Sequence, residues 1–408
     1  MAKFLILGQN YSPLVGKIQA RGDDYILLQD SSTQFSSKID VSRCIKVDFK
    51  DPASAIETAG HLRGEIDGVV TLYEQYVLPL ARIAHSLSLP APDIQTAEAC
   101  TDKLLMRRRF AAADEQISPA FAEVKDEDSL LEFAAAHGYP LIIKPVHLSK
   151  SLLIMRCDSK QELIENYRNI KRQIGEAYSK YAVARQPQLL VEEFMEGPQY
   201  STDAFVDADG RIHMIDCIAR LQTGHDIGYG DNFIYSRQFS DDLAAELRQQ
   251  IFHVSAMGIS ALGIKSAPAF IQLVLTKQGP RIIEIAARNG GYRERMYQLA
   301  MGIDLLGNTL ELALGHGVNI RPVKNEPCAV LELFPKKAGI FAGIRAEQEL
   351  RALPSLQYLS IKATAGSPIG KSSDGYKMTA VIVLHHQDRG QFAHDLEFIN
   401  RNVFVETV

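Results

Sequence analysis

The sequence predicts a multidomain protein of mixed α/β and α+β class. Short strands alternate with helices over residues 1–95, which is typical of a parallel sheet covered on both faces. Two later pairs of strands are joined by turn sequences, Asp207-Ala208-Asp209-Gly210 and Lys277-Gln278-Gly279-Pro280, and therefore predict antiparallel hairpins. A length of 408 residues corresponds to roughly two to four domains.

Residues 1–95 form the first expected domain. The expected strands are Phe4–Leu7, Tyr25–Gln29, Ile45–Phe49 and Gly68–Leu72, and the expected helices are Pro13–Arg21 and Tyr76–Leu87. The phosphate-binding pattern G-x-G-x-x-G does not follow the first strand, which disfavours a nucleotide site here. The sequence Pro90-Ala91-Pro92 breaks the chain and marks the boundary.

The remaining residues predict a core over 96–324 and a small β-rich domain over 325–408. One helix is expected from Thr96, with Asp102 and Lys103 in its first turns. The other core elements are strands Leu141–Lys144, Leu152–Cys157 and Leu189–Glu193, a helix over about Gln161–Gly175, and hairpins Thr202–Val206 with Ile212–Ala219 and Phe270–Thr276 with Arg281–Ile285. The last domain is expected to contain strands Cys328–Phe334, Leu356–Ala363 and Met378–Leu384 and a helix near Gln391–Asn400.

The composition excludes several classes of protein. Hydrophobic residues make up 46% and charged residues 23%, as in an ordinary globular protein. The net charge of −5 predicts no nucleic-acid partner. No apolar run approaches the roughly 18 residues of a membrane span, so no membrane partner is expected. The five cysteines show no C-x-x-C spacing, which disfavours disulfides and structural zinc and predicts a cytoplasmic location.

Four segments carry the residue types that ATP-dependent phosphoryl transfer requires, namely cations, metal-binding carboxylates and a strand edge for adenine. In chain order they are Thr101–Arg107, Tyr139–Pro145, Leu190–Ser201 and Ile283–Gly291. Their order resembles that of the ATP-grasp superfamily, in particular the carboxylate–amine ligases that join amino acids. The resemblance covers nearly the whole chain and rests on the order, because each motif alone is unspecific. It implies three domains, in which the core has a mobile lid over residues 120–195.

Lys144 ends an apolar strand and precedes a proline, which fixes its ammonium at the end of that strand. The resemblance implies that Lys144 and Lys103 reach the ATP phosphates from two sides, a role that suits a compact positive charge. The alternatives are a lysine extended to solvent at a sheet edge for Lys144 and a solvated helix face for Lys103. A solvated face is the expectation for Arg107, Arg108 and Arg109.

The segment after the strand Leu189–Glu193 resembles the adenine hinge of the family. The resemblance implies that the backbone of Glu193 and Met195 reads the adenine edge and that the carboxylate of Glu192 or Glu193 lies near the ribose. Gln199 replaces a glutamate that the motif usually has, and it is expected among the ATP contacts. The alternative is an exposed turn before Gly197.

Glu284 and Arg288 are the centre of the predicted site. Side chains alternate along a strand, so both residues point to one face, about 13 Å apart if the strand stays extended. Glu284 is expected to ligate Mg²⁺ (or Mn²⁺), which prefers oxygen donors, and Arg288 to act as the catalytic residue by stabilising charge on the transferring phosphoryl group. Gly290 and Gly291 would let a substrate carboxylate approach the backbone. The alternative is a surface ion pair on a hairpin.

The sequence also departs from the family pattern. Gln272 stands where a second acidic metal ligand is usual, so it offers an oxygen but no charge, and Ala286 replaces an asparagine. The loop after the lysine strand contains no glycine, which gives its backbone less freedom to wrap phosphates. In that loop, Ser149 and Lys150 are the expected phosphate contacts.

The segment Leu221–Asp231 contains three glycines and is the expected substrate loop. His225 and Arg293 are candidate substrate-binding residues, although a histidine in a loop is often only solvated. The expected activity is ATP-dependent amide formation between small-molecule carboxylate and amine substrates through an acyl phosphate. The alternatives are an ATP-grasp enzyme of purine or carboxylase type and a nucleotide-binding protein without turnover. The resemblance also allows a homodimer.

Overall fold

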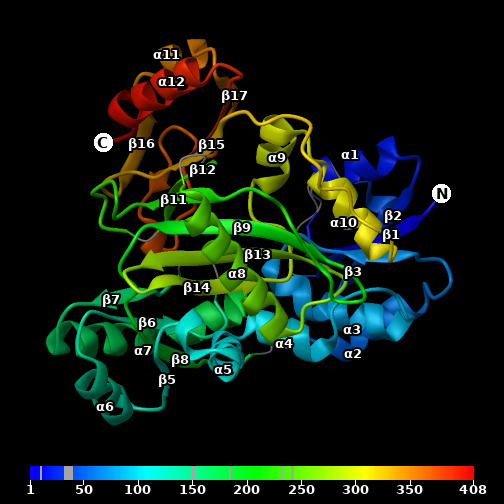
Figure 1. Ribbon diagram of the computed structural model, residues 1–408, viewed down its shortest axis with the longest axis horizontal. Helices are drawn as coiled ribbons and strands as arrows, with labels where there is room; N and C mark the ends of the chain where they lie inside the picture. Colours follow the sequence, from blue (N-terminus) through cyan, green and yellow to red (C-terminus); the bar gives the residue numbers. More distant parts are fainter. Residues whose placement is uncertain (10–11, 32–39, 149–151, 183–184, 232, 240–242) are drawn as a thin grey trace.

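A computed structural model describes residues 1–9, 12–31, 40–148, 152–182, 185–231, 233–239 and 243–408. Its strands form four sheets. Figure 1 shows a long central sheet in the middle, the N-terminal sheet beside it, a lid sheet next to strands β13 and β14, and the C-terminal helices at the opposite end. This arrangement is mixed α/β and α+β, as predicted.

The N-terminal sheet is parallel, as predicted. Its strand order is β3 (Cys44–Val47), β2 (Asp24–Asp30), β1 (Lys3–Leu7) and β4 (Gly68–Val70). Helices α2 (Pro52–Gly60) and α3 (Val77–Leu87) cover one face, and α1 (Ser12–Ala20) covers the other. Helix α10 (Leu305–Ala313), far along the chain, packs beside α1, so later residues complete this domain's core.

The single helix expected from Thr96 is wrong, because the structure has two helices there. Helix α4 (Ile94–Thr101) ends before Asp102, and α5 (Lys103–Ala113) begins after it. The backbone of Asp102 is extended, and its side chain accepts a hydrogen bond from the Leu105 N–H at 2.9 Å. A short acidic side chain that caps a helix in this way favours a helix start over a helix interior. Lys103 is therefore the first residue of α5.

The segment predicted as the lid contains an antiparallel sheet with two helices on one face. Its strand order is β5 (Phe121–Val124), β8 (Leu189–Glu193), β6 (Leu141–Pro145) and β7 (Met155–Cys157), and its helices are α6 (Glu127–His137) and α7 (Lys160–Tyr181). Apolar residues of both helices form one cluster with the strands. Strand β7 begins later than expected and α7 is longer than expected.

The central sheet has nine strands. Their order is β14 (Gly279–Ala286), β13 (Ala267–Thr276), β9 (Gln199–Val206), β11 (Ala219–Thr223), β12 (Ile234–Phe239), β15 (Cys328–Leu333), β19 (Ala380–His385) and β17 (Leu356–Ile361), with β10 (Ile212–Met214) paired to β9. Helix α8 (Ala245–Leu262) covers one face and α9 (Arg293–Met301) the other. The expected strand Ile212–Ala219 is wrong: it divides into β10 and the start of β11, because Ile215 and Ile218 turn into different cores.

The strands expected in a separate C-terminal domain extend the central sheet instead of starting a new one, because β15 pairs with β12. A small sheet of β18 (Pro368–Ile369), β16 (Gly339–Ile344) and β20 (Val405–Thr407) lies beyond them, with α11 (Glu347–Ala352) and α12 (Arg389–Asn402). Strand β16 was not predicted. The remaining helical turns are 3-10 helices at Val41–Arg43, Glu74–Tyr76, Glu115–Ile117 and Ser372–Asp374.

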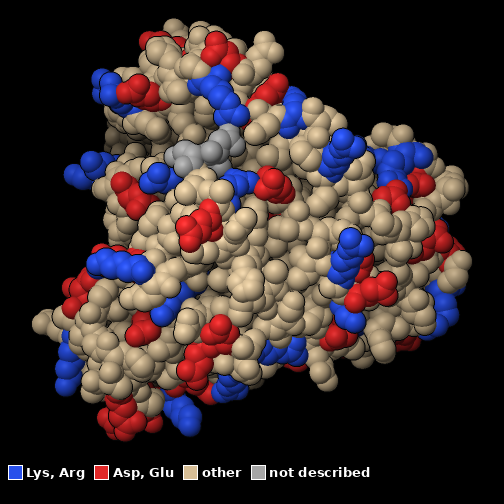
Figure 2. Space-filling view, viewed as in Figure 1, with Lys and Arg blue, Asp and Glu red and all other residues tan. Residues whose placement is uncertain are grey.

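Two further features concern membrane-spanning helices and the distribution of charge on the surface. In the described part of the chain, no helix combines the length and apolarity needed to cross a membrane. On the face drawn in Figure 2, Lys and Arg side chains are interspersed with Asp and Glu, and neither sign gathers into one large patch.

Candidate active site

The predicted metal ligands lie directly opposite each other on neighbouring strands. Gln272 of β13 pairs with Glu284 of β14 on one side and with Ser201 of β9 on the other. Directly opposed residues of neighbouring strands share a face, so these three side chains form a row. No three His, Cys, Asp or Glu side chains gather around a metal position within the described ranges. One carboxylate with one amide oxygen fits Mg²⁺, which completes its shell with water and substrate phosphates.

Arg288 was expected on the same extended strand as Glu284. This expectation is wrong, because β14 ends at Ala286. The Arg288 Nε instead lies 2.7 Å from Oε2 of Glu74, and its Nη1 donates to the carbonyl of Asn289 at 2.9 Å. Glu74 begins the short 3-10 helix Glu74–Tyr76 (η2), just after strand β4 of the N-terminal sheet. Burial raises the pKa of Glu74, the positive charge of Arg288 opposes this, and the charge of Glu284 adds to it. The predicted catalytic arginine is thus held by a second domain, close to the predicted metal ligand.

Lys144 belongs to a buried cluster of three charges. Its Nζ lies 2.6 Å from one carboxylate oxygen of Glu192, and Nε of Arg107 lies 2.7 Å from the other. Arg107 is fully buried and also donates to the carbonyl of Ile283 at 2.6 Å. The solvated face predicted for Arg107 is therefore wrong, since this side chain connects α5 to lid strand β8 and central strand β14. Arg108 is exposed, as expected, whereas Arg109 donates to the carbonyl of Leu262 at 2.6 Å.

Burial controls the charges in this cluster. It lowers the pKa of Lys144 to about 8, although the neighbouring carboxylate of Glu192 works in the opposite direction. Burial alone would raise the pKa of Glu192, but Arg107 and Lys144 together hold it below its ordinary value. Nη1 of Arg107 is buried and has no hydrogen-bond acceptor in the described part of the chain. A buried donor without an acceptor is costly, and two cations beside one carboxylate leave this cluster with an excess of positive charge.

Lys103 faces the residues that follow strand β6. Its backbone N–H donates to the carbonyl of Val146 at 3.3 Å, and its Nζ donates to the carbonyl of Leu148 at 2.7 Å. Its positive charge helps to lower the pKa of Lys144 and opposes the rise that burial causes in the pKa of Glu74. The two predicted phosphate-binding lysines therefore lie within electrostatic range of each other and of the second-domain carboxylate.

Comparison with known proteins agrees with this geometry. Residues 137–294 match the family model of the ATP-grasp domain. The chain carries an ATP-grasp domain. This match includes Lys144, Glu192, Glu284 and Arg288, and the fold around them is that of ATP-grasp proteins. Lys103 and Glu74 lie before the matched residues and contact the domain from outside its limits.

Relatives extend the similarity beyond the ATP-grasp domain. An uncharacterized protein, y4rH of Sinorhizobium fredii, is 25% identical over 312 residues, which are 76% of this chain and 62% of that protein. The alanine–anticapsin ligase of Bacillus subtilis is 24% identical over 243 residues, which are 55% of this chain and 49% of the ligase. The chain thus spans less than two thirds of these relatives' length.

Solved structures share the fold over the whole chain. The structure of L-amino acid ligase from Bacillus licheniformis has a TM-score of 0.82 at 21% identity, with 100% of this chain and 99% of that chain covered. Phosphoribosylglycinamide synthetase from Anaerococcus prevotii has a TM-score of 0.71 at 17% identity, with both chains fully covered. At these identities the likeness shows the fold alone.

In the segment predicted as the adenine hinge, the backbone N–H of Glu193 donates to the carbonyl of Ala120 at 3.0 Å, and its carboxylate accepts from the Ala120 N–H at 3.1 Å. Met195, in the connection after β8, and Gln199, the first residue of β9, are half-buried. The carboxylate of Glu192 holds Lys144 and Arg107 rather than lying at the surface. Contacts of Glu193, Met195 and Gln199 with a nucleotide remain predictions.

The two glycines that follow strand β14, Gly290 and Gly291, have different surroundings. A Cβ added to Gly290 would lie 2.5 Å from Phe270 Cδ2, whereas one added to Gly291 would meet nothing within 4 Å. The Gly290 N–H also helps to lower the pKa of the buried Asp203, although burial of that carboxyl dominates and raises it. Gly290 is therefore required by close packing, and Gly291 has open space beside its backbone; the contact of these two glycines with a substrate stays a prediction.

Arg293 is fully buried and has internal partners. Its Nε lies 3.3 Å from Oδ2 of Asp203, and its Nη2 donates to the hydroxyl of Ser201. Tyr297 donates to the same Asp203 oxygen at 2.9 Å. Arg293 was predicted to contact a substrate. The structure instead buries it, and it supports Ser201, which stands in the same row as Gln272 and Glu284.

The structure does not bring His225 into the cluster, because this residue is exposed in the loop after β11. Ser149 and Lys150 lie outside the described residues. Sequence reasoning missed Glu74, Asp203 and the burial of Arg107. Glu74 had one usable signal, because it follows the last strand of a parallel sheet at the carboxyl end, where ligand sites of such sheets lie.

Proposed function

We propose that the chain is an ATP-dependent carboxylate–amine ligase that joins amino-acid-like substrates and releases ADP and phosphate. The observation that carries this proposal is the opposed pair Gln272 and Glu284, with Arg288 held beside it by Glu74. Lys103, Lys144 and Arg107 supply positive charge from α5 and the lid. The relationship to alanine–anticapsin ligases supports the substrate class, and the fold is one that an L-amino acid ligase also has.

In the first step, a substrate carboxylate oxygen attacks the γ-phosphorus of ATP. A new O–P bond forms, the bond from the γ-phosphorus to the bridging oxygen breaks, and ADP leaves. Lys103 and Lys144 bind the phosphates, and Arg288 stabilises the charge that develops on the transferring group. Glu284 and Gln272 would hold Mg²⁺, which when bound neutralises phosphate charge.

In the second step, the nitrogen of an amine substrate attacks the carbonyl carbon of the acyl phosphate. A C–N bond forms, the C–O bond to phosphate breaks, inorganic phosphate leaves, and the nitrogen loses its proton to solvent. The residues named here position and neutralise, and no side-chain nucleophile takes part.

A panel of amino-acid pairs tests this proposal. With ATP and Mg²⁺, the release of ADP and phosphate is expected to depend on two amino acids together, and mass spectrometry is expected to show the amide. Arg288→Ala is expected to lower kcat by about 100-fold or more while ATP still binds, since the lost interaction forms in the transition state. Arg295→Ala, on the next helix, is the matched control. Full activity of Arg288→Ala would refute the catalytic assignment.

A nucleotide-binding protein without turnover is the second candidate. It is favoured by Gln272, which leaves Glu284 as the charged member of the predicted metal pair. Calorimetry that shows ATP binding, together with no ADP release for any pair of amino acids, would select this candidate over the ligase.

A further inference from the structure

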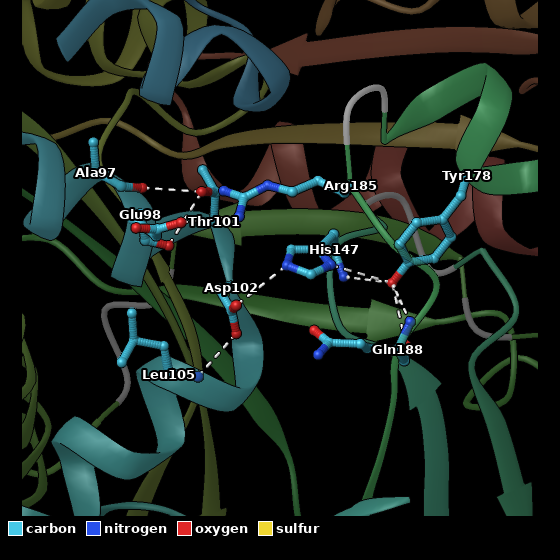
Figure 3. Close-up of polar contacts among 9 residues, drawn as sticks. All are labelled: Ala97, Glu98, Thr101, Asp102, Leu105, His147, Tyr178, Arg185 and Gln188. Atoms are coloured by element: carbon cyan, nitrogen blue, oxygen red, sulfur yellow. Dashed lines mark hydrogen bonds and ion pairs between the residues drawn. The ribbon is translucent and has the colours of Figure 1, made fainter. Parts of the chain in front are cut away.

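A histidine at the start of the loop after β6 joins three parts of the molecule. His147 follows Lys144 by three residues, and its side chain is only 6% exposed. Its Nε2 lies 3.2 Å from Oδ2 of Asp102, and its Nδ1 lies 3.3 Å from the hydroxyl of Tyr178. Figure 3 shows the imidazole between these two side chains, one at the start of α5 and the other near the end of lid helix α7. Both ring nitrogens are therefore engaged.

The chemistry of one partner fixes the direction of its hydrogen bond. An ionised carboxylate only accepts, so Nε2 of His147 carries a proton and donates it to Asp102. The single hydroxyl proton of Tyr178 is donated to the carbonyl of Gln188 at 3.1 Å, and Nδ1 of His147 contacts the oxygen of the same hydroxyl. Burial alone would raise the pKa of Asp102, but hydrogen bonds from His147 and the Leu105 N–H lower it, so this acceptor stays ionised.

Asp102 divides its two oxygens between two tasks. Oδ1 accepts from the Leu105 N–H and caps α5, and Oδ2 accepts from His147. The first residue of that helix is Lys103, whose N–H and Nζ donate to the carbonyls of Val146 and Leu148 on either side of His147. The position of Lys103 and the position of the His147 turn thus determine each other.

Tyr178 ties the same turn to the lid. The backbone N–H of His147 donates to the Tyr178 hydroxyl at 3.2 Å, and that hydroxyl also lies 3.1 Å from the carbonyl of Gln188, which precedes β8. The Val146 N–H donates to the same carbonyl at 3.0 Å. A second connection between the same parts, from Arg185 to Glu98 of α4, is 3.0 Å long (Figure 3).

We propose that His147 is a positioning residue, which places the Lys103 ammonium for the ATP phosphates by joining Asp102 of the core to Tyr178 of the lid. The proposal rests on the nucleotide site of the proposed function. The sequence gives a reason for such a connection: residues 146–152 contain no glycine. In a glycine-rich loop, the freedom of the backbone lets it adapt to the phosphates. Here, hydrogen bonds of a fixed imidazole would instead hold the phosphate-binding groups in position.

Four variants of the full chain test this role. His147→Ala removes both connections, and His147→Gln keeps an N–H that can reach Asp102. Asp102→Asn keeps the helix cap, since asparagine caps as well as aspartate, but removes the ionised acceptor. Tyr178→Phe removes only the hydroxyl. The matched control is His213→Ala, because His213 makes a similar 3.0 Å contact to Asp207 in the β9–β10 turn, outside the site.

The expected result is a selective loss of nucleotide binding. His147→Ala and Asp102→Asn raise KM for ATP and the calorimetric Kd of ADP with Mg²⁺ by about tenfold, the equivalent of one charged hydrogen bond. The KM values of the amino acids change less than about twofold, because their binding does not use Lys103. His147→Gln recovers part of the affinity, and His213→Ala changes neither constant.

Four outcomes decide between this proposal and the proposed function. Normal nucleotide binding by His147→Ala overturns the positioning role while leaving the ligase intact. Equal losses in His147→Ala and His147→Gln, accompanied by equal falls in melting temperature, overturn it in favour of a merely structural contact. A wild-type chain that releases no ADP, but binds ADP more tightly than His147→Ala does, refutes the ligase and supports the positioning role. Absence of nucleotide binding by the wild type overturns both.

Discussion

Lys144 is a buried ammonium whose charge changes within the pH range of ordinary assays. Its pKa of about 8 means that the free protein loses this positive charge as the pH rises through that value. Since the charge faces the predicted phosphate site, kcat/KM for ATP is expected to be level near pH 7 and to fall above about pH 8, by up to about tenfold per pH unit. A pH series of initial rates at low ATP concentration measures this fall, the alkaline limb of the pH profile.

Arginine at position 144 provides the control for this pH dependence. A guanidinium stays protonated throughout the assay range, so Lys144→Arg is expected to lose the alkaline limb, whatever its rate at pH 7. Its melting temperature shows whether the larger side chain is accepted beside Glu192. An unchanged limb in a folded Lys144→Arg variant would assign the titration to another group.

Sequence reasoning predicted Lys103, Lys144, Glu284 and Gln272 as site residues, and the structure brings these residues to one region, where their roles stay predictions. It failed for Arg107 because burial depends on a partner that lies 85 residues away, Glu192. A spacing of four along a helix puts Lys103 and Arg107 on one face. This spacing was the signal in the sequence that Arg107 faces the site together with Lys103. Nothing local in the sequence could show that Glu74 of another domain would meet Arg288.

At the scale of elements, the hairpin β13–β14 was predicted, and its register places Gln272 opposite Glu284. The failures arose where a polar side chain or a change of core interrupts a regular pattern. Asp102 divides one apparent helix in two by capping α5, and Ile215 and Ile218 divide one apparent strand by packing into opposite cores. Such interruptions depend on tertiary contacts, which hydrophobic periodicity does not contain.

The cross-strand pair gives a prediction with opposite signs for stability and metal binding. Gln272→Glu places two carboxylates opposite each other, so the protein without metal is expected to melt at a lower temperature than the wild type. Mg²⁺ is expected to reverse this difference, and the Mg²⁺ concentration for half-maximal ADP release should fall about three- to tenfold, because the second carboxylate adds charge to the site. Melting curves and rates across a Mg²⁺ titration measure both effects.

A neighbouring position on strand β13 offers a control for Gln272→Glu. Val274 lies two residues further along β13 and pairs with Arg281 rather than with Glu284. Val274→Thr is therefore expected to leave the Mg²⁺ dependence unchanged. A Gln272→Glu variant whose Mg²⁺ dependence equals that of the wild type would remove Gln272 from the metal site.

At the scale of the whole molecule, the chain is more continuous than its predicted domains suggest. The central sheet passes through the limit expected at residue 324, because β12 pairs with β15. Helix α10 of the predicted core completes the N-terminal sheet. The domain limits at residues 95 and 324 remain predictions, since a count of strands and helices along the sequence does not reveal which sheet each element joins.

Two leucines of helix α10 allow this continuity to be tested, because they pack in two different hydrophobic clusters. Leu310 is fully buried among Phe4, Ile6 and other residues of the N-terminal domain, whereas Leu312 of the same helix packs in the cluster that contains Tyr297. Leu310→Ala is expected to cost about 2–5 kcal/mol, as other buried leucines do. Because the lost contacts belong to the N-terminal sheet, amide hydrogen exchange should accelerate first in β1 and β4.

Leu312→Ala is the matched control, with the same substitution on the same helix. It is expected to accelerate exchange first in α9 and β15, where its contacts lie, and to leave β1 and β4 closer to the wild type. If Leu310→Ala left exchange in the N-terminal sheet unchanged, the core of that domain would be complete without α10. Because Glu74 follows β4 and reaches Arg288 across this boundary, loosening the sheet should also lower turnover in Leu310→Ala more than in Leu312→Ala.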